Sequence, residues 1–190
     1  MILSSKRLSS HEDLLEFAKQ YKLISGNNNS VELLRKRSFV GAFYNAKGKM
    51  CAGFTINSDS PLTYLHDLPK DLIHPLTHAD KEIVEGGGLW VNPELSDCER
   101  GYVFIKASWQ AYRTKKKYFM AGAKNPKVAS RQKFIYPKIL FEGATEQFDY
   151  LCILYCRRHY ILIQIALFFL RYWITQPLKK WLRGARQATT

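Results

Sequence analysis

Three consecutive glycines, Gly86 to Gly88, interrupt an apolar, β-rich segment that runs from Ile83 to Val91. Glycines inside a strand often mark a bulge or the close approach of another backbone, and such places can hold a ligand. The loop after this segment ends at Arg100-Gly101, directly before apolar residues at helical spacing. Because backbone N–H groups at a helix N-terminus attract anions, this loop is a candidate pyrophosphate site. Relief of crowding against a helix is the alternative interpretation of the glycines.

Histidine and aspartate residues form a second polar group between residues 57 and 80. His74 and His78 are four positions apart and could share one helix face, an arrangement that suits zinc. Pro75 disfavours a regular helix through both residues and the chain has no His-Glu-x-x-His pattern, so we predict no metal site. We expect this segment to be a loop, with a short helical piece, that recognises the substrate. Its polar members are His66, Asp67, Asp71, His74, His78 and Asp80.

Local signals predict the elements of the N-terminal half. Ser10 precedes apolar residues at helical spacing and predicts a helix over residues 11–24, and Ser30 predicts a short helix over residues 31–36. Two β-rich runs, 39–44 and 50–56, flank a turn that contains a glycine, which is typical of a β-hairpin.

In the second half, strands are expected to alternate with helices. Residues 102–113 repeat apolar side chains on one face, which predicts a helix between the strands 83–91 and 118–123. The remaining predicted elements are a helix over 126–136 and closing strands over 139–141 and 148–155. Alternation of this kind implies crossovers with parallel pairing, whereas the hairpin implies antiparallel pairing. We therefore predict an α/β (α+β) fold with a mixed sheet.

Two segments resemble the GCN5-related N-acetyltransferase (GNAT) superfamily. Trp90-Val-Asn-Pro, followed by Glu99-Arg-Gly-Tyr102, is similar to that family's fourth strand and the phosphate-binding loop before its third helix. Tyr136-Pro-Lys-Ile-Leu-Phe141 is similar to its Tyr-x-Lys-Leu-Gly-Phe segment, with leucine where glycine is usual, and Val103 occupies the position of a loop glycine. The order of elements from about residue 11 to 156 also fits. The resemblance implies that residues 1–156 form a GNAT-like acyltransferase domain of a divergent member, with helices flanking the mixed sheet.

The resemblance implies an acyl-CoA dependent N-acyltransferase that transfers an acetyl or longer acyl group to an amine, with acetyl-CoA or another acyl-CoA as co-substrate. It makes Tyr136 the general acid for the leaving thiolate. Glu85, which lies six residues before Val91 and on the same face of a regular strand, is our candidate general base, acting directly or through water. A bulge at the glycines would instead turn the two residues to opposite faces. Alternatively, Tyr136 is an ordinary half-buried aromatic residue and Glu85 is a solvent-facing strand residue.

The resemblance also implies which residues hold the donor. The strand backbone would bind the acyl carbonyl and the pantetheine arm, and the following residues would face the pyrophosphate. The first group is Leu89, Trp90 and Val91, and the second is Arg100, Gly101, Tyr102 and Val103.

Basic residues are concentrated in two zones of a chain that carries a formal net charge of +13. Residues 1–99 contain 11 basic and 13 acidic residues, whereas residues 100–141 contain 11 basic and no acidic ones. Positive zones attract the phosphates of cofactors, nucleic acids and anionic lipids. Aromatic residues lie among the lysines of this zone, so a catalytically inactive GNAT-like protein that binds nucleic acid, or acts as a membrane adaptor, is the alternative function.

Residues 157–190 form the second basic zone, with seven basic and no acidic residues. Its segment 160–174 is apolar nearly all round, interrupted by Gln164 and Arg171. Fifteen helical residues rise about 22 Å, which is short of the ~30 Å hydrocarbon core of a bilayer. We therefore expect a C-terminal helix that lies on an anionic membrane surface rather than one that crosses it. The alternatives are packing on the chain's own domain or on a second copy in a homodimer.

The four cysteines have no zinc-finger spacing, and we expect Cys152 and Cys156 to be buried thiols in a reducing compartment. The N-terminus lacks the apolar run of a secretion signal. These features predict a cytoplasmic protein, peripheral on the inner face of the membrane.

Overall fold

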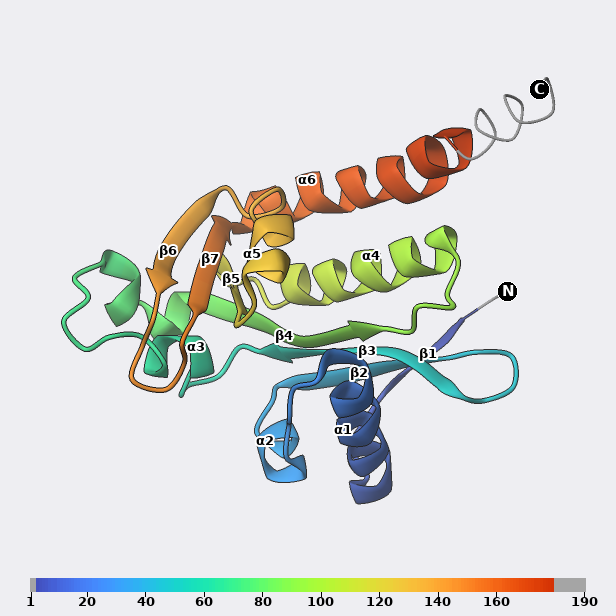
Figure 1. The fold of residues 1–190 in the computed structure, drawn as a ribbon, viewed down its shortest axis with the longest axis horizontal. Helices are drawn as coiled ribbons and strands as arrows, with labels where there is room; N and C mark the ends of the chain where they lie inside the picture. The colour runs from blue at the N-terminus through green and yellow to red at the C-terminus, as the bar shows by residue number, and fades with distance from the viewer. Residues whose placement is uncertain (1–2, 180–190) are drawn as a thin grey trace.

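The computed structural model describes residues 3–179, which form a seven-stranded sheet with helices on both faces (Figure 1). The strand order is β1-β2-β3-β4-β5-β7-β6. The strands are β1 (Ser4–Arg7), β2 (Phe39–Tyr44), β3 (Met50–Asn57), β4 (Ile83–Val91), β5 (Tyr118–Ala123), β6 (Lys138–Gly143) and β7 (Leu151–Arg157). The α-helices are α1 (His11–Ser25), α2 (Val31–Arg35), α3 (Thr63–His66), α4 (Asp97–Arg113), α5 (Pro126–Gln132) and α6 (Arg158–Phe169). Two 3₁₀ turns, η1 (Pro75–His78) and η2 (Asp80–Glu82), precede β4, and a π-helical segment, η3 (Leu170–Thr175), continues α6.

The predicted mixed sheet is confirmed. The crossover through α4 makes β4 and β5 parallel, and every other neighbouring pair is antiparallel. The expectation of further parallel pairing is wrong, because the crossover through α5 leads to the edge strand β6, which pairs antiparallel with β7. The second half therefore closes as an antiparallel hairpin beside a single parallel pair.

The helices cover the two faces unequally, with α1 and α2 below the sheet in Figure 1 and α4 and α6 above it. The predicted helices in the first 36 residues are confirmed: Ser10 accepts a hydrogen bond from the N–H of Asp13, and Ser30 accepts one from Leu33. Such caps satisfy donors that a helix N-terminus otherwise leaves unpaired. The buried ring of Phe17 anchors α1 against Trp90 of β4, with ring centroids 6.0 Å apart.

Two predicted helix boundaries are wrong, and one strand was not predicted. Helix α4 begins at Asp97, five residues before the predicted start, because Ser96 and Glu99 form a reciprocal capping box. Helix α5 ends at Gln132 instead of residue 136. The edge strand β1 has no counterpart in the sequence analysis, because all four of its residues are exposed and it therefore lacks the alternation that marks a strand.

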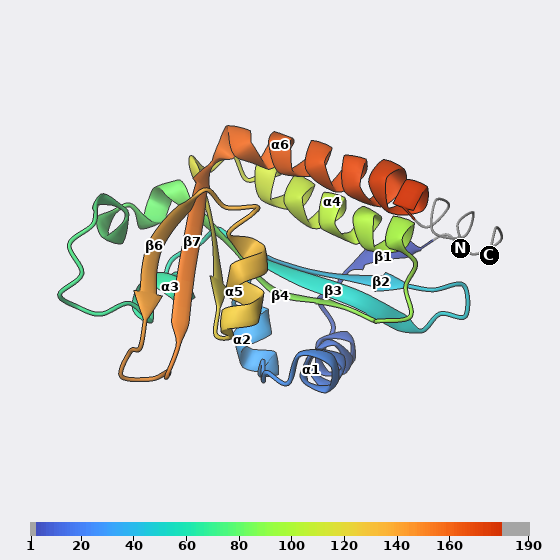
Figure 2. The ribbon, with the colours of Figure 1, turned by 45° about the horizontal axis from the view of Figure 1, so that its top comes forward.

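Helix α6 leaves the end of β7 directly and runs alongside α4 (Figure 2). Phe104 of α4 stacks on Phe168 and Tyr172, with centroid distances of 4.9 and 5.8 Å. The C-terminal helix therefore forms an outer layer that packs mainly on α4, and its first turns also contact β5 and β7 of the sheet. Cys152 and Cys156 of β7 are buried free thiols, as predicted.

Candidate active site

A gap opens in the sheet where β4 and β5 separate. Their parallel pairing ends at Gly86 and Ala121, although β4 continues to Val91. The last residues of β5 pair on their other side with β7. Among the described residues, the edge of β4 beyond Gly86 thus has no strand partner on the side of β5. Its peptide groups there are available to an extended ligand.

A β-bulge shapes this end of β4. Gly53 pairs with Trp90 and Thr55 with Gly87, so two residues, Gly88 and Leu89, lie opposite one residue of β3. Gly88 has a φ of 53°, in the left-handed region that favours glycine. The bulge that the glycine run suggested is therefore present.

The bulge reverses the alternation of side chains along β4. Glu85 contacts α3 on the face that also carries α1, and Trp90 packs on α1, whereas Val91 packs into the core beneath α4. The prediction that Glu85 and Val91 share a face is therefore wrong, because it assumed a regular strand. Leu89 is 42% exposed, and the buried Trp90 indole N–H has no acceptor among the described residues.

Tyr64 of α3 covers the gap on one face of the sheet. Gly87 and Gly122 make room for it: a Cβ at Gly122 would lie 2.5 Å from the Tyr64 ring, and one at Gly87 would lie 3.2 Å from its hydroxyl oxygen. Burial raises the pKa of the Tyr64 phenol. Tyr64 was not predicted as a site residue, since nothing in the sequence around α3 points to a strand gap.

Tyr136 approaches from the opposite face, where it packs on Phe119 of β5 with ring centroids 5.4 Å apart. Only glycine fits at position 86, because a Cβ there would lie 2.7 Å from the Phe119 ring. Burial raises the pKa of Tyr136 well above its usual value. The Tyr136 phenol therefore stays protonated at neutral pH and can donate a proton. It is buried rather than half-buried.

Glu85 is buried, with 2% of its side chain exposed, so the alternative of a solvent-facing residue is wrong. Its carboxylate accepts hydrogen bonds from the backbone N–H groups of Thr63 (2.9 Å) and Tyr64 (2.6 Å), and Arg37 Nη1 lies 3.5 Å away. Burial raises the pKa of Glu85, and these partners oppose that shift. Glu85 thereby ties Tyr64 to the strand that borders the gap.

The first turn of α4 is where the resemblance places the donor's pyrophosphate. Glu99 Oε2 accepts hydrogen bonds from the Ser96 backbone N–H (2.9 Å) and hydroxyl (2.7 Å), and the Ser96 hydroxyl accepts one from the Glu99 N–H. Asp97 adds a second carboxylate to this turn. Because the turn is capped from within and carries two negative charges, it does not fit a pyrophosphate in this arrangement.

The four residues predicted to face the pyrophosphate lie within α4 instead of in a loop. The Arg100 backbone N–H donates to the Ser96 carbonyl, and its guanidinium donates to the carbonyls of Leu95 (2.9 Å) and Pro93. Gly101 is covered by the C-terminal helix. Tyr102 meets Phe43 edge-on at 5.9 Å, and Val103 is fully buried. The predicted placement failed because the helix was expected to begin at residue 102. The Ser96-x-x-Glu99 pattern was the sequence signal for the earlier start of α4.

Replacing Gly101 by alanine is expected to loosen the C-terminal helix. A Cβ at this position would lie 2.3 Å from Trp173 Cζ3 and 2.6 Å from Tyr172 Cβ. Although alanine favours helices intrinsically, the overlap should cost about 1–3 kcal/mol of unfolding free energy. Hydrogen exchange should show faster exchange across η3. Gly143→Ala is the control, because its Cβ would meet nothing closer than 3.4 Å. A Gly101→Ala protein with unchanged stability and exchange would contradict this packing.

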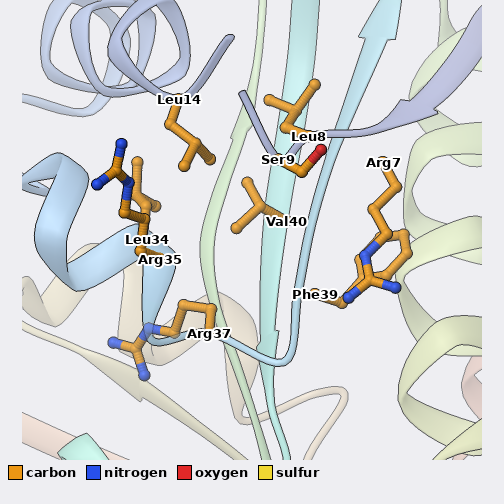
Figure 3. Close-up of a pocket in the computed structure, with 9 residues that line it drawn as sticks. All are labelled: Arg7, Leu8, Ser9, Leu14, Leu34, Arg35, Arg37, Phe39 and Val40. Carbon is orange, nitrogen blue, oxygen red and sulfur yellow. The ribbon is translucent and has the colours of Figure 1, made fainter. Parts of the chain in front are cut away.

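A shallow pocket of about 360 Å³ lies near the site, where β1 and α1 meet α2 and β2 (Figure 3). Its floor is apolar and its rim carries three arginines. Arg35 contacts His11 Nδ1 at 3.1 Å, and Arg37 lies beside Glu85, which connects the pocket to the gap. The lining residues are Arg7, Leu8, Ser9, Leu14, Leu34, Arg35, Arg37, Phe39 and Val40.

Neither a family model nor a curated protein matches the sequence. Solved structures do match its fold. FeeM, an N-acyl amino acid synthase from uncultured soil microbes, has a TM-score of 0.62 and 13% identity over 86% of this chain and 94% of its own. The Escherichia coli ribosomal-protein-S18-alanine N-acetyltransferase (TM-score 0.53, 9% identity) covers 82% of this chain and 94% of its own. A Bacillus subtilis acetyltransferase solved with CoA (TM-score 0.53, 11% identity) covers 82% of this chain and 99% of its own.

Proposed function

We propose that the chain is an N-acyltransferase that moves an acetyl or longer acyl group from an acyl-CoA to an amine. It has the fold of the GCN5-related N-acetyltransferases, and we take it as a divergent member of that superfamily. The observation that supports this most strongly is the gap between β4 and β5, with unpaired strand edge on one side and a protonated phenol on each face. A gap with side chains on both faces can hold a donor and an acceptor in fixed positions, which suits the transfer of a group between two substrates.

The proposed step forms one C–N bond and breaks one C–S bond. Backbone N–H groups of β4 around Leu89 and Val91 polarise the thioester carbonyl, which the amine attacks. Tyr136 donates its phenolic proton to the departing thiolate, and the proton that the attacking nitrogen loses as the amide forms returns to the Tyr136 phenolate. The ammonium proton of the acceptor passes to Glu85 through water, because both carboxylate oxygens already accept hydrogen bonds from α3. The raised pKa of Glu85 makes its carboxylate a stronger base than an exposed one.

The acceptor class follows from the arginine-rimmed pocket that Arg37 joins to the site. Arginine binds carboxylates well, so an amine that also carries a carboxylate fits this side of the sheet. FeeM is described as an N-acyl amino acid synthase. A free amino acid is therefore the first acceptor to test.

Donor recognition should rest on the pantetheine arm more than on the nucleotide, because the first turn of α4 is capped by Glu99 and carries Asp97. We expect calorimetry to detect binding of acetyl-CoA or a longer acyl-CoA. The dissociation constant of the corresponding S-acyl-pantetheine should lie within about tenfold of the acyl-CoA value, a difference of about 1.4 kcal/mol in binding free energy. Arg100→Gln should change the affinity for acyl-CoA little, since this guanidinium is held by loop carbonyls.

Absence of binding to every thioester would overturn the enzymatic proposal. If RNA or DNA bound instead, with an affinity that falls steeply with salt, the chain would be a basic, non-catalytic relative. If S-acyl-pantetheine bound far more than tenfold more weakly than acyl-CoA, the result would show that α4 rearranges to bind the phosphates.

We further propose that the reaction takes place at a membrane surface, where an acyl chain or its amide product would partition. The C-terminal helix supports this location, since residues Arg158–Lys179 form 22 helical residues with a mean hydropathy of 1.4 over their most apolar window.

A further inference from the structure

The C-terminal helix has one packed side and one exposed apolar side. On the packed side, the α6 residues Ile161, Gln164 and Phe168 are buried against the rest of the domain. The exposed part of the helix carries apolar residues at intervals of three and four along the chain. We call these residues the apolar stripe. They are Tyr160, Ile163, Leu167, Leu170, Ile174 and Leu178, each 37–53% exposed.

The apolar stripe covers a long surface. It extends over 19 positions from Tyr160 to Leu178, and Leu162 and Phe169 widen it. Monomeric soluble proteins rarely leave a contiguous apolar surface of this kind in water, so the stripe marks a contact with a partner or a membrane. Figure 2 shows α6 as the outermost layer of this face, with α4 beneath it.

The packed side argues against a membrane-crossing helix. The expectation that the helix is too short to span is corrected, because its 22 residues are enough by length and composition to cross a membrane. Gln164 is nevertheless buried, and its side-chain amide donates to the Ile135 carbonyl at 3.1 Å and to Cys156 Sγ at 3.4 Å. These contacts and the Phe104–Phe168 stack hold the helix lengthwise on the domain, so only its outer side is free for contact.

A cluster of positive charge adjoins the start of the stripe. A shallow pocket there is lined by Tyr112, Lys115, Lys117, Arg157, Arg158, His159 and Leu162. Leu162 flanks the stripe, so the two surfaces are continuous. Arg158 stacks on the Tyr112 ring at 4.0 Å, and Lys117 pairs with exposed Glu82 at 3.0 Å. Among the described residues, Lys115 and Arg157 have no ion-pair partner.

We infer that α6 lies flat on an anionic membrane, with the apolar stripe among the upper acyl chains and the basic cluster against lipid phosphates. This inference deepens the membrane location in the proposed function. Residues 157–179 contain no acidic side chain, so the surface that they form complements negative headgroups. A second copy fits less well, because it would bring together two chains of net charge +13 with no carboxylates from this segment to offset them.

Vesicle sedimentation of the full chain tests the inference. We expect binding to phosphatidylcholine vesicles that contain 30 mol% phosphatidylglycerol, and roughly tenfold weaker binding to phosphatidylcholine alone. Leu167→Glu with Leu170→Glu should weaken binding to anionic vesicles by a further factor of about ten or more. The control is Ile73→Glu, which alters a 99% exposed residue far from α6 and should change nothing.

The charge contribution is tested separately. Lys115→Gln and Arg157→Gln should each lower binding to anionic vesicles roughly fivefold. Lys47→Gln and Lys49→Gln, in the β2–β3 turn, remove equal charge and should have no effect. Circular dichroism checks folding, and Leu178→Glu serves as a second stripe variant if the double variant unfolds.

Equal binding to both vesicle types, no binding, or unchanged binding of the stripe variants would overturn the inference. If the wild type is dimeric and the stripe variants become monomeric without any vesicle binding, the surface instead contacts a second copy. Acyl transfer to a soluble amine, measured without vesicles, should be equal in all these variants. This measurement separates failure of the membrane contact from failure of the proposed enzymatic function.

Discussion

Tyr136→Phe should lower kcat of acyl transfer by about 10²–10⁴-fold while leaving the affinity for the acyl donor unchanged. The variant retains the ring that packs on Phe119 and loses only the hydroxyl group. Under the proposed mechanism this group protonates the leaving thiolate, so its removal affects the transition state and not the binding of the donor. Rapid-quench or steady-state kinetics, combined with calorimetry of donor binding, would measure the two effects separately.

The control for this variant is Tyr155→Phe. Tyr155 is as buried as Tyr136, at 9% exposure, but it lies on β7 and contacts His74. Removing the Tyr155 hydroxyl should leave kcat within about twofold of the wild-type value. Equal activity of Tyr136→Phe and the wild type would remove the general acid from the proposed mechanism.

The pH dependence of Tyr136 has a defined sign. Burial raises the pKa of its phenol in the folded state above the unfolded value of 10.0. The group is therefore protonated throughout the neutral range, and its ionisation should not produce a decline of kcat below about pH 10. For the same reason its contribution to stability is complete below pH 10 and is lost as the pH rises through the folded-state pKa.

Glu85→Ala should destabilise the fold by about 3–5 kcal/mol, measured by urea unfolding. The substitution leaves the N–H groups of Thr63 and Tyr64 without their acceptor, and leaves the Arg37 guanidinium, 13% exposed, without its carboxylate. Unsatisfied buried donors and an unpaired buried charge are each costly. Tyr64 should also lose its fixed position over the gap.

Two further variants make this prediction specific. Glu85→Gln keeps one carbonyl acceptor and no charge. Because burial raises the pKa of Glu85 and so disfavours its ionised form, the glutamine variant should cost less than the alanine variant. Glu82→Ala removes an exposed ion pair with Lys117, whose side chains are 48% and 59% exposed, and should cost less than about 1 kcal/mol. Stability of Glu85→Ala equal to that of Glu82→Ala would contradict the anchoring role.

Local patterns were sufficient to predict much of the fold. The caps at Ser10 and Ser30, the hairpin, and the strand over 83–91 depend on residues close together in the chain, so their signals are legible in sequence. The resemblance to the GNAT superfamily was likewise correct for the fold. Strand β1 was missed because an exposed edge strand need not alternate apolar and polar residues.

The candidate site was less predictable. The glycine run indicated a bulge, but only the pairing of β4 with β3 showed that the bulge turns Glu85 and Val91 to opposite faces. Tyr64 reaches the gap from a loop more than 50 residues before its contact at Gly122, a contact that no local pattern encodes. The position of Glu99 within the cap of α4 could have been read from the sequence, and it alters how the donor's phosphates can bind.

The sequence by itself determined that the C-terminal segment is helical, apolar and basic, because helix propensity, hydropathy and charge belong to residues individually. Which of its sides faces water was decided only by the tertiary structure. Packing of Phe168 and Tyr172 on Phe104 buries one side of the helix and leaves the apolar stripe exposed. The same is true of the gap at Gly86, because which strand pairs with which is set by contacts between segments far apart in the chain: beyond this point β4 stays paired with β3 and β5 with β7.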